Sequence, residues 1–93
     1  MTRNNDVRDD EAVLAVDVGN TATRLGVARA GRMVAAWDAT TPERLTADEA
    51  LVVLRDFFAV RSLGFEISSA IVSSVVPALT DVWVSAAGVV SHK

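Results

Sequence analysis

Residues 12–37 have the sequence AVLAVDVGNTATRLGVARAGRMVAAW, and this stretch decides the fold. Positions 12–18 are apolar almost throughout, as expected of a strand covered on both faces. The segment 19–21 interrupts this run, and a second strand is expected over 23–28. Ala30 and Gly31 then supply a tight turn into a third strand over 32–37. Because both connections are short, the three strands are predicted to run antiparallel.

The hydrophobic period changes to that of a helix after this meander. Thr46 and Glu49 are spaced as a capping box, and the predicted inner face of the helix is Ala47, Ala50, Leu51, Leu54, Phe57 and Phe58. A strand is expected over 69–76. A second helix is predicted to begin at Pro77 and to end at Gly88, with the inner face Leu79, Val82, Trp83 and Ala86.

The predicted order is therefore β-β-β-α-β-α, an α/β fold with a mixed sheet, since a helical crossover brings the fourth strand parallel to its neighbour. Residues 1–11 (MTRNNDVRDDE) are expected to form a disordered tail, and residues 12–93 a single domain. This domain looks incomplete, because such an architecture ordinarily continues into another crossover strand.

Composition excludes several classes of function. The net charge is −3 and the Lys and Arg residues are scattered, which argues against nucleic acid as a partner. No apolar run approaches the roughly 20 residues that span a bilayer, and no hydrophobic signal segment is present, so no membrane partner and a cytoplasmic location are expected. The lack of cysteine excludes disulfides and thiolate metal sites. His92 is next to the last residue, where a frayed end is favoured over a ligand.

Asp17 is the unusual residue of the opening stretch. A simple hairpin turn explains Gly19 and Asn20, but it does not explain a carboxylate at the end of an apolar strand. A buried carboxylate without a partner is costly, so either this strand end is open to water or Asp17 has a ligand.

A phosphate site accounts for all four residues of the motif. Backbone amides around Gly19 and the hydroxyl of Thr21 are suited to phosphate oxygens, and Asp17 beside them is suited to a divalent cation. Taken alone, the pattern Asp-x-Gly-x-Thr is weak, and the turn interpretation is then favoured.

Three segments in register add to this pattern: LAVDVGNTATRLGV, TPERLTADEALVVL and AIVSSVVPALT. In order and spacing they resemble the N-terminal half of type III pantothenate kinases, a family that includes the Bvg accessory factor-like proteins. The resemblance implies the first half of an actin-like ATPase, or ribonuclease H-like, domain. It implies ATP-phosphate binding by Asp17, Gly19, Asn20 and Thr21, with the metal at Asp17.

The family's reaction phosphorylates pantothenate with ATP to 4'-phosphopantothenate, on the route to coenzyme A. The resemblance further implies magnesium or another divalent cation, a monovalent cation such as potassium, and a homodimer. Ala22 and Arg24 depart from the family pattern, which often has Asn and an apolar residue there. The Gly-x-Asp-Arg segment with the catalytic base, the second phosphate motif and the adenosine-binding segment have no counterpart in this chain.

These gaps leave three hypotheses. The chain is the N-terminal phosphate-binding portion of a kinase, present as a domain, a truncation or one part of a split enzyme with a partner half, and inactive alone; or it is a non-catalytic regulatory module of the Bvg accessory factor-like family; or it is a structural remnant. Substrate contact by Ser73 and Ser74 is a second choice behind strand termination. Trp37 and Trp83 are expected in the core or an interface, with ligand stacking as a minority alternative.

Overall fold

The computed structural model describes residues 11–91, so His92 and all of the predicted tail except Glu11 lie outside the described residues. The elements are β1 (Ala12–Val18), β2 (Ala22–Arg29), β3 (Arg32–Thr40), α1 (Ala47–Val60), β4 (Ile67–Ser74) and α2 (Pro77–Val90). The predicted order β-β-β-α-β-α is confirmed. None of the helices in this part of the chain is long and apolar enough to cross a membrane.

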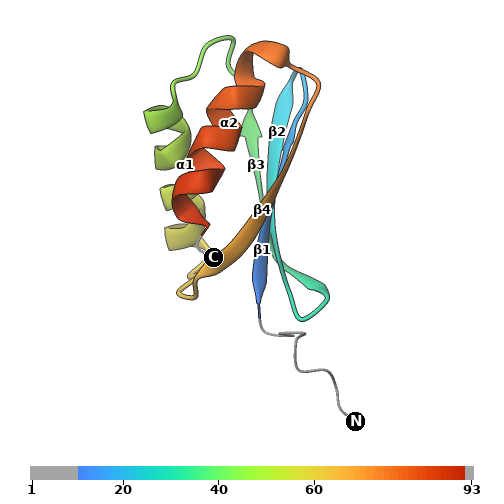
Figure 1. Ribbon diagram of the computed structural model, residues 1–93, viewed down its shortest axis with the longest axis vertical. Helices are drawn as coiled ribbons and strands as arrows, with labels where there is room; N and C mark the ends of the chain where they lie inside the picture. The colour runs from blue at the N-terminus through green and yellow to red at the C-terminus, as the bar shows by residue number, and fades with distance from the viewer. Residues whose placement is uncertain (1–10, 92–93) are drawn as a thin grey trace.

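The four strands form one mixed sheet in the order β3-β2-β1-β4. β1 and β2 pair antiparallel, as do β2 and β3, whereas β4 lies parallel to β1. Both helices cover the same face of this sheet (Figure 1). The opposite side, called the open face below, carries no helix among the described elements.

This one-sided cover corrects the expectation for β1. Leu14, Val16 and Val18 are buried under the helices, while Ala15 is half-buried and Asp17 is exposed on the open face. The prediction of a strand covered on both faces is therefore wrong. A nearly continuous apolar run does not distinguish a strand covered on one face from a strand covered on both when an outward position holds a residue as small as Ala15.

The core lies between the sheet and the two helices. Its members are apolar side chains that alternate along the strands and recur at helical spacing in α1 and α2; the largest that are fully buried include Leu14, Leu25, Val27, Leu54, Phe57, Leu79 and Trp83. The core thus ties both helices to the central strands β1 and β2, and this fixes the end of β1 where the motif begins.

Most of the local signals operate as predicted. The Thr46 hydroxyl accepts from the Glu49 amide at 3.1 Å, and the Glu49 carboxylate accepts from the Thr46 amide at 2.9 Å, which completes the capping box. Ala30 and Gly31 both have positive φ, 55° and 76°, as a tight hairpin turn requires.

Some element boundaries differ from the sequence prediction. α2 continues through Gly88 to Val90, so the predicted stop is wrong; a glycine lowers helix stability without ending the helix where its neighbours stay packed. β3 extends to Thr40 because it stays paired with β2 as far as Ala22. β4 covers residues 67–74 and not 69–76, since Val75 already belongs to the turn into α2.

Candidate functional site

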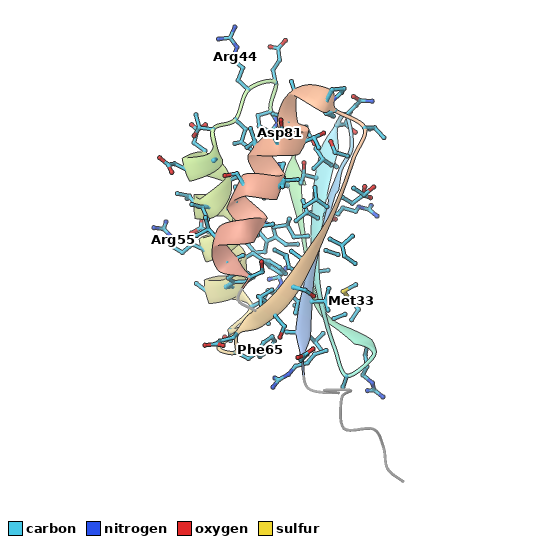
Figure 2. All side chains as sticks on the ribbon, viewed as in Figure 1. Met33, Arg44, Arg55, Phe65 and Asp81 are labelled. Carbon is cyan, nitrogen blue, oxygen red and sulfur yellow. The ribbon has the colours of Figure 1, made fainter. Side chains whose placement is uncertain are left out.

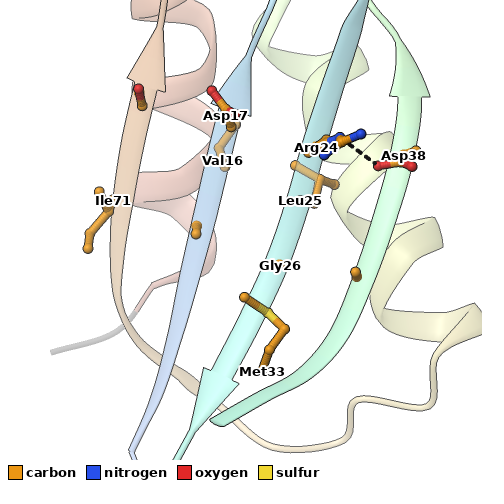
Figure 3. Close-up of a pocket in the computed structure, with 11 residues that line it drawn as sticks. Val16, Asp17, Arg24, Leu25, Gly26, Met33, Asp38 and Ile71 are labelled. Carbon is orange, nitrogen blue, oxygen red and sulfur yellow. Dashed lines mark ion pairs between the residues drawn. The ribbon is translucent and has the colours of Figure 1, made fainter. Parts of the chain in front are cut away.

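Asp17 lies at the end of β1, on the open face of the sheet, with its side chain exposed (Figure 3). The strand end is therefore open to water, and the carboxylate carries no burial cost that a ligand must offset. Its neighbours in the sheet are Arg24 on β2 and Ser73 on β4, each directly opposite it in register. Asp17 is thus accessible from the solvent side of the sheet.

The turn after β1 leaves two backbone amides free. The Gly19 amide donates to the Ala22 carbonyl at 2.9 Å and is used within the turn. Among the described residues, no backbone partner accepts from the amides of Asn20 and Thr21. The two donors that the turn itself offers to an anion are therefore the amides of Asn20 and Thr21, and Gly19 contributes shape.

The shape of the turn depends on the missing side chain of Gly19. A Cβ built there would stand 3.0 Å from the Ala22 carbonyl oxygen, which belongs to the backbone of the same turn. That separation is tighter than ordinary van der Waals contact, so a larger residue would push the turn apart.

Thr41, the residue after β3, forms hydrogen bonds to the turn and to the start of β2. The Thr41 amide donates to the Thr21 carbonyl at 3.0 Å, and the hydroxyls of Thr41 and Thr23 are 2.8 Å apart. Thr23 is 1% exposed and Thr41 is half-buried, so this hydroxyl pair lies at the edge of the core. Sequence reasoning missed Thr41; the available signal was Thr23, a hydroxyl at an inward position of β2 where the next inward residues are Leu25 and Val27.

The other side of the site is formed by the end of β4. The Val75 amide donates to the Val18 carbonyl at 3.0 Å, which extends the β1–β4 pairing past the last strand residues. The Ser74 hydroxyl accepts from the Val76 amide at 3.1 Å and shapes the turn into α2. Ser73 lies on the open face beside Asp17, whereas Ser74 serves the strand end as predicted.

Neither tryptophan lies at the site. Trp83 is buried in the core of α2, and Trp37 is half-buried with its ring 6.0 Å from that of Phe57. The guanidinium carbon of Arg61 lies over the Trp37 ring, 4.9 Å from the ring centroid. The expected core role is confirmed for Trp83.

A shallow pocket of about 480 Å³ occupies the open face next to Asp17. Its apolar floor is made of small residues such as Ala15 and Gly26, between the larger side chains of Met33 and Ile71. Figure 2 shows Met33 on the side of the sheet away from the helices. The volume falls within the range of about 300–1,000 Å³ that is usual for small-molecule pockets.

Asp17 would need other ligands to hold a metal ion. Within residues 11–91 no group of three or more carboxylate or imidazole side chains is placed to bind a cation. Magnesium, however, usually takes one or two carboxylates and completes its shell with water and phosphate oxygens. An exposed carboxylate, followed in the adjoining turn by two amides without a backbone partner among the described residues, is therefore suited to a hydrated magnesium ion that also binds phosphate, whereas a cation bound by protein groups alone would need more ligands than Asp17.

Gly19→Ala is expected to lower the free energy of unfolding by about 1–3 kcal/mol, because the new methyl group overlaps the backbone of the turn. Gly64→Ala is the matched control, since a Cβ there meets nothing within 4 Å. Urea denaturation of both variants measures the difference. Equal stabilities would contradict the close approach at Gly19.

Comparison with known proteins identifies what the chain is similar to. The sequence model of the family described as "Type III pantothenate kinase" matches residues 13–90. A type III pantothenate kinase of Pelobacter propionicus is 42% identical over 71 residues, which cover 75% of this chain and 28% of the relative. A type III pantothenate kinase of Rubrobacter xylanophilus is 45% identical over 69 residues, covering 73% of this chain and 26% of the relative.

The chain therefore spans little more than a quarter of the length of these relatives. Among solved structures, a ROK family glucokinase from Streptomyces griseus, in complex with glucose and AMPPNP, is similar with a TM-score of 0.49. That similarity has 23% sequence identity and covers 68% of this chain and 20% of the glucokinase chain.

Proposed function

The chain belongs to the type III pantothenate kinase family, and from this premise we propose that it supplies the ATP-phosphate-binding portion of a pantothenate kinase. The reaction would transfer the terminal phosphoryl group of ATP to the hydroxyl of pantothenate. The named relatives are kinases, so they do not favour the alternative of a non-catalytic regulatory module.

The observation that carries this proposal is the exposed carboxylate of Asp17 beside the free amides of Asn20 and Thr21. The amides would donate to phosphate oxygens, and the hydroxyl of Thr21, which is exposed, would add a third donor. Asp17 would hold a hydrated divalent cation against the same phosphates. When bound, magnesium would neutralise part of the negative charge on the phosphate oxygens.

Other parts of the proposal do not rest on the site. Pantothenate as the acceptor, a monovalent cation such as potassium and self-association are carried over from the family, and a cytoplasmic location is proposed from the composition of the sequence. The residues of this chain that match the family's pattern do not include a catalytic base. We therefore propose that these 93 residues alone catalyse no phosphoryl transfer and bind nucleotide weakly.

Equilibrium dialysis of labelled ATP against the purified chain tests this function. Wild type is expected to retain ATP with magnesium and to lose most of it with EDTA. Asp17→Asn, which keeps the size of the side chain but removes its charge, is expected to weaken binding about tenfold in magnesium. Retention that is equal in EDTA, or unaffected by Asp17→Asn, would sink the proposal.

A further inference from the structure

Four polar side chains form a row across the open face at the level of Asp17. In strand order they are Asp38 on β3, Arg24 on β2, Asp17 on β1 and Ser73 on β4, and each is directly opposite the next in register. Side chains opposite each other in a sheet have Cβ atoms about 4.5–5.5 Å apart. Arg24 therefore stands next to two carboxylates, one on either side.

Arg24 is paired with only one of them. Its Nε is 3.4 Å from Oδ1 of Asp38, and Figure 3 shows the guanidinium directed toward β3 and away from Asp17. The two side chains are 70% and 71% exposed, so water and salt screen this pair and its hold on Arg24 is weak. In the described part of the chain no ion pair engages Asp17.

The two carboxylates of this row would repel an approaching phosphate group. Asp17 and Asp38 are both negative, and without Arg24 this edge of the pocket would repel an anion. A guanidinium offsets this repulsion, because it is positively charged and its planar donors bind phosphate oxygens in pairs. Arg24 is the one cationic residue among those that line the pocket.

Resting on the function proposed above, we propose that Arg24 is a second cation of the phosphate site. The ion pair with Asp38 turns the guanidinium toward β3, so Asp17 stays available to a metal ion, and because this pair is weak a phosphate group can displace it. When the phosphates of magnesium-ATP lie at the turn, Arg24 exchanges the carboxylate of Asp38 for phosphate oxygens.

The test follows the amides of Asn20 and Thr21 and the side-chain Nε signal of Arg24 by NMR during a magnesium-ATP titration of the 93-residue chain. Arg24→Met is expected to weaken binding about tenfold, as loss of a hydrogen bond to a charged group does, and Arg24→Lys should weaken it less. The matched control is Arg55→Met, because Arg55 is equally exposed and paired with Asp56 on α1, away from the pocket (Figure 2).

The outcomes separate this inference from the proposed function. A shift of the Arg24 signal together with a loss of affinity specific to Arg24→Met supports it. If Asn20 and Thr21 respond but Arg24→Met binds as wild type does, or more tightly, the role of Arg24 is wrong and the proposed function stands. If neither amide responds in wild type, the proposed function itself fails and the role of Arg24 fails with it.

Discussion

Trp83→Ala is expected to lower the free energy of unfolding by about 3–5 kcal/mol, the usual cost of removing a large aromatic side chain from a packed core. Trp83 is 2% exposed and faces the sheet from α2. The loss is a large fraction of the total stability expected for a domain of this size. Urea denaturation followed by circular dichroism measures it.

Trp83→Phe provides the matched comparison. The indole Nε1 of Trp83 is buried without a hydrogen-bond partner in the described part of the chain, which is itself destabilising. Phenylalanine keeps most of the ring and removes this unsatisfied donor, so its stability is expected to stay within about 1 kcal/mol of wild type. If both variants lose the same stability, Trp83 does not pack as described.

Phe57→Ala is expected to cost a similar amount, about 3–5 kcal/mol. Phe57 lies in α1 and is fully buried. The centroid of its ring is 6.0 Å from the ring centroid of Trp37 and 5.6 Å from that of Phe58. Removing it would leave a cavity between α1 and the sheet. Thermal and urea unfolding measure the loss.

Val60→Ala is the control for this second variant. Val60 lies on the same helix, but its side chain is 59% exposed. Surface substitutions of this kind usually change stability by less than about 0.5 kcal/mol. A Phe57→Ala variant as stable as Val60→Ala would mean that α1 turns a different face to the sheet.

The fold was predictable from the sequence where the signals are local. The interrupted apolar run, the Ala30–Gly31 turn and the capping box at Thr46 each depend on neighbouring residues, and each is confirmed. The cover of β1 was not predictable in this way, since it depends on where two helices distant in sequence come to lie. The end of α2 was mispredicted because Gly88 is tolerated inside a helix whose neighbours are packed.

The candidate site shows the same contrast between residues that are neighbours in sequence and residues that only the fold brings together. Asp17, Asn20 and Thr21 are contiguous, so the sequence alone places them together. Thr41 reaches the turn, and Asp38 reaches Arg24, only through the register of β2 and β3. No short sequence motif specifies which residues of two separate strands pair. The contact of Thr41 with the turn and the ion pair of Asp38 with Arg24 are therefore known only from the structure.

The central claim is that the turn after β1 binds the phosphates of magnesium-ATP, and amide NMR of the wild-type chain and Asp17→Asn tests it most directly. The account predicts that the signals of Asn20 and Thr21 shift on addition of magnesium-ATP, that the amide of Gly19, already bonded to Ala22, moves less, and that Asp17→Asn suppresses the response. Shifts that need no more magnesium-ATP in Asp17→Asn than in wild type, or that avoid Asn20 and Thr21 altogether, would contradict it.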